Sequence, residues 1–158
     1  MAMDRLAKLL RTREFVSFAT ADPGGQPNAA PKLLLKYEKP FVYLIDYSIA
    51  LTVANLRNNP KAALSIMDLE NLQGYRLSGA AELIEKGEEF ERFKKEHEKK
   101  LIQLSATRVI EGSRTGKKSS HYELEIPDKF AVIKFKIDEA VQIGTQGDLY
   151  REKGHNIS

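Results

Sequence analysis

Short runs in which apolar and polar residues alternate recur along the chain, separated by turn signals such as Asp22-Pro23-Gly24-Gly25. They predict strands at Glu14–Thr20, Asn28–Lys36, Phe41–Asp46, Lys61–Asp68 and Gly74–Glu85, and near His121–Ile126, Phe130–Ile137 and Val141–Ile143. The tight turns favour antiparallel pairing, and a closed or nearly closed barrel protects the edges of so many strands. We therefore expect a mainly β fold with flanking helices (α+β), built on an antiparallel barrel in one domain over residues 1–158.

Two segments have the three- and four-residue spacing of amphipathic helices. The first covers residues 1–14, with Leu6, Leu9 and Leu10 facing inward. The second is Gly87–Ser105, and its inner face carries Phe90, Phe93, His97, Leu101 and Leu104. Because His97 lies on this apolar stripe, we interpret it as a packed histidine rather than a metal ligand or a catalytic base.

A shorter helix follows the strand that ends at Asp46 and closes at Asn58-Asn59-Pro60. Ser48, Thr52 and Asn55 share one face of this helix, and Ile49, Val53 and Leu56 form an apolar face beside it. A helix N-terminus offers free N–H groups and a partial positive charge, which suit a phosphate. The alternative is an ordinary amphipathic helix whose polar face lies in water.

Composition excludes several classes of protein. The net charge of +3 is too small to indicate nucleic-acid binding, and the absence of cysteine excludes disulfides and thiolate sites. The three histidines are scattered, so no metal site is expected. No apolar run reaches the roughly 18 residues of a membrane helix, and the start of the chain does not resemble a signal peptide. We therefore expect a cytoplasmic protein.

One motif imitates a phosphate-binding P-loop. The segment from Gly112 to Lys117 is one residue too short, and Lys118 stands where serine or threonine is needed. We predict a solvated loop here, over Gly112–Ser120.

Three segments together resemble the FMN-binding split-barrel family related to pyridoxamine 5′-phosphate oxidase. They are FVSFATADPGGQPNAAPKLLLK, then YLIDYSIALTVANLRNNPKAALSI, then QGYRLSGAAEL. The resemblance implies an antiparallel split β-barrel that binds FMN at the interface of a homodimer.

The resemblance also implies where FMN lies. The site residues that it suggests on one chain are Pro31, Lys32, Leu33, Asp46, Ser48, Thr52 and Asn55. Residues around Gln73, Gly74 and Arg76 would come from the partner chain. Pro31 interrupts its strand, which indicates an edge, a bulge or a nearby ligand. Gly74 permits close backbone approach, or marks a strand bulge.

The sequence departs from the family pattern in two places. Leu51 or Thr52 replaces a phosphate-binding lysine of the short helix, so Lys32, Lys36 or the 114–118 loop would have to substitute. Nothing after His121 resembles the oxidase's Trp-Arg-Leu substrate motif, so we do not expect a true pyridoxamine 5′-phosphate oxidase.

The resulting hypothesis is an FMN oxidoreductase that passes hydride or electrons between NAD(P)H and an unidentified small-molecule acceptor. No residue stands out as an acid or base. The alternatives are a flavin-binding or flavin-storage module without turnover, and a split barrel that binds F420 or heme.

Overall fold

The computed structural model describes residues 3–116 and 129–157, and these fall into two compact units. One comprises Met1–Glu85 and Phe130–Ser158, and the other is Lys86–Lys129. We call the first the barrel unit. One domain over residues 1–158 stays a prediction.

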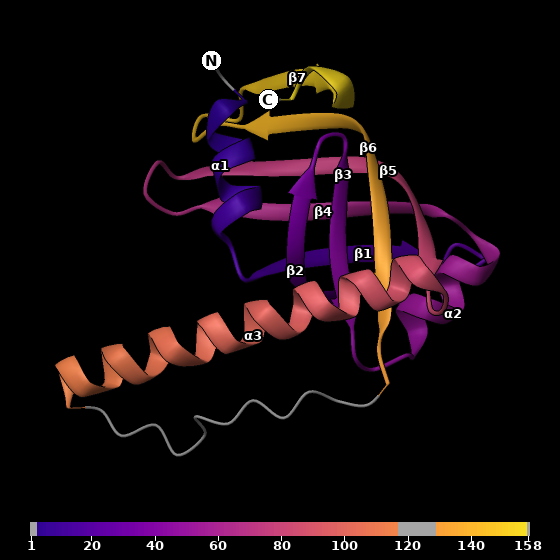
Figure 1. The fold of residues 1–158 in the computed structure, drawn as a ribbon. Helices are drawn as coiled ribbons and strands as arrows, with labels where there is room; N and C mark the ends of the chain where they lie inside the picture. Colours follow the sequence, from indigo (N-terminus) through magenta and orange to yellow (C-terminus); the bar gives the residue numbers. More distant parts are fainter. Residues whose placement is uncertain (1–2, 117–128, 158) are drawn as a thin grey trace. The chain divides into compact units, whose positions relative to one another are not determined.

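The barrel unit is built on a closed antiparallel sheet (Figure 1). Its strands are β1 (Phe15–Ala21), β2 (Pro27–Glu38), β3 (Phe41–Asp46), β4 (Lys61–Asp68), β5 (Gln73–Ile84), β6 (Ala131–Ile143) and β7 (Leu149–Lys153). They are ordered β3-β2-β1-β4-β5-β6-β7, and β3 also pairs with β6, which closes a ring of six strands. The predicted antiparallel split barrel is therefore confirmed.

Most strand predictions are confirmed, and β3 and β4 have their predicted bounds. The two strands predicted over Phe130–Ile137 and Val141–Ile143 are wrong as separate elements, since β6 runs through both. A bulge lets the strand continue between the two predicted segments. Ser78 pairs with Glu139 and Gly79 with Ile137, which leaves Asp138 as the extra residue. Strand β7 was not predicted, and the strand predicted near His121–Ile126 lies outside the described residues.

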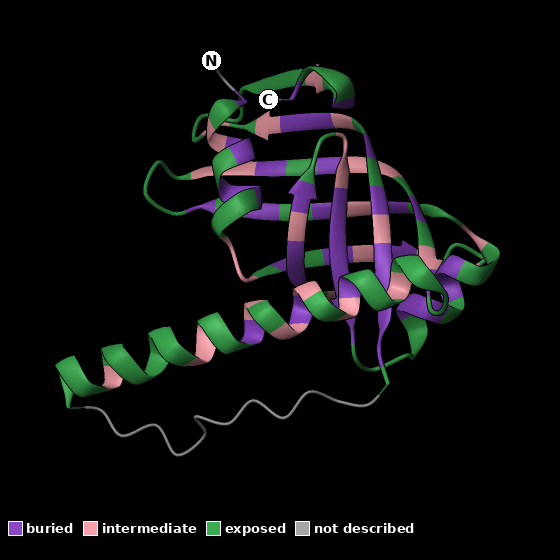
Figure 2. Ribbon diagram, viewed as in Figure 1, coloured by how far each residue is buried: buried purple, intermediate pink, exposed green. Residues whose placement is uncertain are grey.

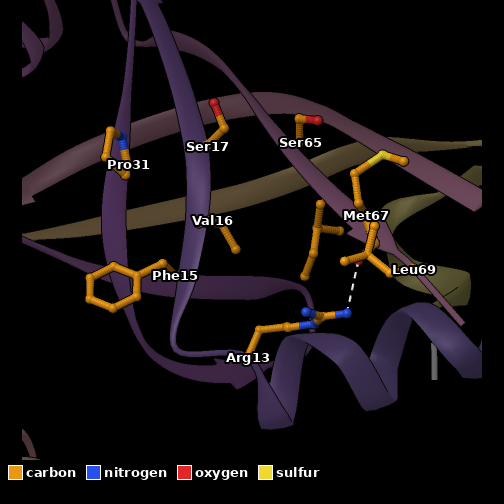
Figure 3. Close-up of a pocket in the computed structure, with 9 residues that line it drawn as sticks. Arg13, Phe15, Val16, Ser17, Pro31, Ser65, Met67 and Leu69 are labelled. Carbon is orange, nitrogen blue, oxygen red and sulfur yellow. Dashed lines mark hydrogen bonds between the residues drawn. The ribbon is translucent and has the colours of Figure 1, made fainter.

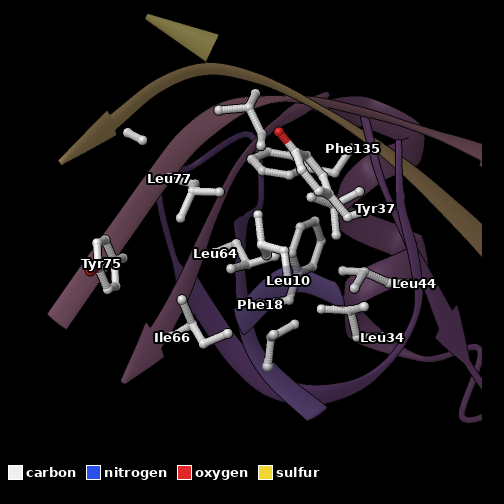
Figure 4. Packing of buried hydrophobic residues seen from close by; sticks show 14 of the residues in the cluster. Leu10, Phe18, Leu34, Tyr37, Leu44, Leu64, Ile66, Tyr75, Leu77 and Phe135 are labelled. Carbon is white, nitrogen blue, oxygen red and sulfur yellow. The ribbon is translucent and has the colours of Figure 1, made fainter. Parts of the chain in front are cut away.

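Alternation along the strands sends one set of side chains into the barrel, as the burial pattern of β4 shows (Figure 2). These side chains form one apolar core (Figure 4). At its centre the rings of Phe18 and Phe135 meet edge to face, with their centroids 5.6 Å apart.

Two short helices lie at opposite ends of the barrel (Figure 1). Helix α1 (Asp4–Thr12) buries Leu6, Leu9 and Leu10 as predicted, and its Arg5 pairs with Asp68, the last residue of β4. Helix α2 (Leu51–Asn58) is joined to the first residue of β4 by Asn59 and Pro60. The chain ends in a short 3-10 helix, Gly154–Asn156.

The second unit contains helix α3 (Glu88–Thr115). This helix continues past its predicted end at Ser105, so the predicted loop over Gly112–Ser120 is wrong for residues 112–115. The helix ends where Gly116 adopts a left-handed conformation, with φ of 68°. Lys117 and Lys118 lie outside the described residues. The predicted inner face is confirmed, because Phe93, His97 and Leu101 are buried and Phe90 and Leu104 are half-buried.

Within the described ranges, no helix has both the length and the apolar character required to cross a membrane.

Candidate functional site

The segment between β3 and α2 has an irregular backbone fixed by Asp46. The Asp46 carboxylate accepts hydrogen bonds from the backbone N–H of Ser48 at 2.9 Å and from its hydroxyl at 2.8 Å. Ile49 then takes a positive φ of 44°, and the helix begins only at Leu51. The expectation that Ser48 and Ile49 lie on the helix is therefore wrong.

The predicted polar face of α2 is turned into the barrel. Thr52 is 2% exposed and Asn55 6% exposed. The Asn55 amide donates to the Thr20 hydroxyl at 3.0 Å, and the Asn28 amide donates to the Thr52 hydroxyl at 3.4 Å. Val53 and Leu56 are also buried. The alternative of a solvated polar face is therefore wrong: these side chains attach α2 to β1 and β2.

Lys32 and Asp46 form a buried ion pair beside this helix. The Lys32 ammonium lies 3.2 Å from Asp46 Oδ1, and the two residues are 5% and 1% exposed. The other carboxylate oxygen, Oδ2, is buried without a hydrogen-bond partner in residues 3–116 and 129–157. Lys36, the other lysine considered for phosphate binding, lies 3.1 Å from the Glu38 carboxylate. Each lysine thus already faces a carboxylate of its own chain.

Strand β2 has a local edge at Pro31, as predicted. Pro31 pairs with Ser17 of β1, but β3 pairs with β2 only from Leu33 onward. Among the described residues, one side of residues 27–32 therefore has no neighbouring strand. Leu33, which begins the pairing with β3, is buried. The edge leaves backbone donors and acceptors available beside the start of α2.

An open groove of about 390 Å³ runs over the outer face of β1, β2 and β4 (Figure 3). Its lining is mostly apolar, with a cation at one end: Arg13, Phe15, Val16, Ser17, Pro31, Ser65, Ile66, Met67 and Leu69. The Arg13 guanidinium donates a hydrogen bond to the backbone carbonyl of Met67 at 3.0 Å. The groove therefore suits a flat, largely apolar ligand.

Four residues form a row across this outer face. The strand register places Pro31 beside Ser17, Ser17 beside Ser65, and Ser65 beside Arg76. Three strand spacings separate the ends of the row, which is about 14 Å. The structure thus brings together the seven predicted residues at the corner of β2, β3 and α2, and separates them from those on β5.

The predicted residues on β5 do not share one orientation. Arg76 and Gly74 belong to the outer face, since they pair with Ser65 and Met67. Gln73 accepts a hydrogen bond from the hydroxyl of the core residue Tyr75 at 3.4 Å. No bulge occurs at Gly74, and a Cβ there would lie 3.3 Å from the flexible Met67 side chain. The bulge interpretation of Gly74 is therefore wrong.

Sequence reasoning missed the residues that build the groove: Arg13, Phe15, Ser17, Ser65 and Met67. The available signal was the alternation within β1 and β4. Once Val16, Phe18, Leu64 and Ile66 are assigned to the core, the residues between them must lie on the outer face. Large apolar side chains at such positions indicate a surface that binds something.

His97 is a packed histidine rather than part of this groove. Burial, and to a smaller extent the charge of Lys100, lowers the pKa of His97 to about 4. Within the described residues, no three histidine, aspartate or glutamate side chains gather as a metal site.

A family model described as pyridoxamine 5′-phosphate oxidase matches residues 2–144. The chain belongs to this family. Membership agrees with the closed antiparallel barrel.

Solved structures support the fold. A Clostridium acetobutylicum protein related to general stress protein 26 of B. subtilis, of the pyridoxinephosphate oxidase family, has a TM-score of 0.64 at 16% identity, covering 98% of this chain and 95% of that one. A heme binding protein from Mycobacterium smegmatis has a TM-score of 0.65 at 18% identity, covering 98% and 58%. A pyridoxamine 5′-phosphate oxidase-related, FMN binding protein from Nostoc punctiforme has a TM-score of 0.56 at 12% identity, covering 96% and 91%. No curated protein matches the chain.

Proposed function

We propose that this chain is a homodimeric FMN-binding flavoprotein that passes hydride or electrons between a reduced nicotinamide and a small acceptor. The observation that carries the proposal is the open edge of β2 at residues 27–32, which lies between the start of α2 and the outer groove. A bound flavin supplies the redox chemistry, and the protein orients it and excludes water.

The groove provides the surface for the flavin ring. Its volume of about 390 Å³ is in the usual range for small-ligand sites. Phe15, Pro31 and Met67 offer apolar contacts, and the backbone of the β2 edge offers hydrogen bonds to the polar rim of the ring.

The start of α2 provides the site for the phosphate. The first N–H groups of a helix have no acceptor within the helix, and Ala50 at the N-cap supplies no side-chain bond to them. Leu51 is 62% exposed, and Ser48 is exposed beside it. Since the first turn has no basic residue and the Ser48 hydroxyl already donates to Asp46, we assign the phosphate to the free backbone N–H groups of this turn.

A second copy of the chain would cover the ring. Phe15 is 55% exposed and Met67 51% exposed on the outer face. Large apolar side chains exposed together indicate a surface that a partner covers. The Arg76 end of the row lies about 14 Å from Pro31, so it is available to the site of a two-fold related copy.

Heme is a second candidate, favoured by one observation. The first turn of α2 lacks a cationic side chain for a phosphate, whereas the groove is open and its lining is mostly apolar. The deazaflavin F420, and flavin storage without turnover, also fit the fold.

Absorbance spectra and ligand titrations test the proposal. FMN should bind at least about tenfold more tightly than riboflavin, because even one hydrogen bond to a charged group contributes about 1.5 kcal/mol. Leu51→Glu should weaken FMN and leave riboflavin unchanged, while Ala54→Glu, exposed on the same helix, should change neither. Equal affinities for the two flavins would contradict the phosphate site, and a Soret band on adding heme would favour the second candidate.

Three further measurements on the same preparation test the rest of the proposal. Light scattering should show a dimer, and a monomer that retains FMN tightly would contradict the shared site. Anaerobic NADH or NADPH should bleach the flavin, and no bleaching would favour storage. Pyridoxamine 5′-phosphate should give no pyridoxal phosphate, since the chain lacks the oxidase motif, and robust product would restore that activity.

A further inference from the structure

A second hollow adjoins the outer groove beside α1. It has a volume of about 310 Å³ and is lined by Arg5, Lys8, Leu9, Thr12, Arg13 and Glu70. Arg13 lines this hollow and the outer groove alike, so the two are neighbours on one surface. An elongated ligand can therefore place a flat apolar part in one and a polar part in the other.

The lining of the second hollow is mainly cationic. Three basic side chains face one carboxylate, that of Glu70. Arg5 is already engaged: its Nε lies 2.6 Å from Oδ2 of the fully buried Asp68, and it also donates to Glu70. Among the described residues, no carboxylate pairs with Lys8, and the Arg13 bond goes to the neutral carbonyl of Met67. Lys8 and Arg13 thus keep charges that an anion can neutralise.

The local structure positions these cations. Arg5, Lys8, Leu9 and Thr12 share one face of α1, spaced by three and four residues. Arg13 follows as the C-cap of the helix, and its guanidinium is held by Met67. The carbonyl end of a helix disfavours an anion, so an anion here requires the two cations.

We propose that the α1 hollow binds the phosphate-bearing end of the reduced nicotinamide donor, whose nicotinamide ring then reaches the flavin ring held in the outer groove. This assignment rests on the proposed function, because the flavin phosphate is placed at α2, at the opposite end of the barrel. Arginine presents a planar fork of donors that matches phosphate oxygens, and lysine adds a mobile point charge. Glu70 is exposed on the rim, and the donor's phosphate would replace it on Arg5.

Binding of redox-inert probes tests the hollow directly. Inorganic pyrophosphate and 2′,5′-ADP are titrated calorimetrically into the full chain. Arg13→Gln should weaken both about tenfold and Lys8→Gln about threefold, since the second side chain is more exposed. Lys61→Gln removes the same charge from an exposed lysine at the far end of β4 and should change nothing. Glu70→Gln should tighten binding about threefold by removing the competing carboxylate.

Kinetics on the FMN-loaded protein tests the donor assignment. Lys8→Gln should raise the KM for NADPH about threefold and leave the dissociation constant of FMN unchanged, because Lys8 lines the α1 hollow and not the outer groove. Arg13→Gln should raise the KM for NADPH about tenfold, and Arg13→Lys should recover part of the loss. Circular dichroism verifies that each variant is folded.

The possible failures are distinguishable. Flavin that is bound and bleached with an unchanged KM would overturn the donor site and leave the proposed function intact. Probe binding with the expected ranking but without flavin binding would overturn the proposed function and support the anion site. If the parent protein bound neither pyrophosphate nor 2′,5′-ADP, the assignment of the hollow as a phosphate site would be overturned. A changed KM for pyridoxamine 5′-phosphate rather than NADPH would overturn the choice of nicotinamide as the ligand.

Discussion

At the scale of single residues, the buried pair of Lys32 and Asp46 is the most sensitive point of the candidate site. Both side chains are almost completely buried, with 3.2 Å between the ammonium and Oδ1. Lys32→Met would leave an uncompensated carboxylate in the barrel, which typically costs about 3–5 kcal/mol. The double variant Lys32→Met/Asp46→Asn removes both charges and should lose clearly less stability than Lys32→Met alone. Urea unfolding measures both free energies.

A surface pair provides the control for this prediction. Arg57 and Glu85 are 2.7 Å apart with exposed and partly exposed side chains, so Arg57→Met should cost no more than about 1 kcal/mol. A loss of similar size in Lys32→Met and Arg57→Met would show that burial does not govern the Lys32 pair.

At the scale of elements, the bulge in β6 depends on a glycine in the strand beside it. A Cβ on Gly79 would lie 1.9 Å from the carbonyl oxygen of Lys136, so the two backbones could not keep their spacing. Gly79→Ala should therefore destabilise the protein by about 3 kcal/mol or more, measured by denaturant unfolding. Gly74→Ala is the matched control on the same strand and should cost less than about 1 kcal/mol, because only the flexible Met67 side chain must move. Equal losses would contradict the tight approach at Gly79.

At the scale of the whole molecule, acid should destabilise the fold in two steps. The pKa of His97 is lowered to about 4 by burial and by Lys100, so between about pH 6.5 and 4 the unfolded chain binds a proton that the folded chain does not. Stability should fall as the pH falls through this window. Hydrogen bonds from Arg5 and then Asn71 hold the pKa of Asp68 well below its usual range, so the stability that Asp68 contributes is present above about pH 4 and is lost below it.

Unfolding free energies measured from pH 7 to well below pH 4 separate these contributions, because the His97 loss falls above pH 4 and the Asp68 loss below it. His97→Gln should flatten the profile between pH 6.5 and 4. His155→Gln changes an exposed histidine of the 3-10 helix and should leave the slope in place. An unchanged slope in His97→Gln would assign the loss to other groups.

The barrel was predictable because its strands carry strong local signals. Phe18 and Leu64 each lie between small or polar neighbours, and turn residues separate the runs. The exact ends depended on tertiary structure. Strand β6 passes Asp138 because β5 supplies Gly79 as a bulge partner, and α3 extends to the left-handed Gly116. Local periodicity identifies neither the role of Gly79 in the bulge nor the role of Gly116 as the end of the helix.

The candidate site was less predictable because it depends on contacts between distant segments. The spacing of Thr52 and Asn55 indicated a shared face, but their burial depends on Thr20 and Asn28. The pairing of Lys32 with Asp46 joins residues on two strands. Arg13 follows a helix, and its position in the groove is fixed by Met67. The family resemblance supplied the β2 and α2 residues, and only the structure supplied the groove.

The open edge of β2 also has a consequence for solubility. A strand edge left unpaired for a ligand can also accept a strand from another polypeptide, and such pairing initiates aggregation. Pro31 and Pro27 both lie in this segment, and neither has a backbone N–H that could donate to a carbonyl of an incoming strand. The edge thus retains acceptors and some donors for a small molecule, while it is a poor template for a full strand.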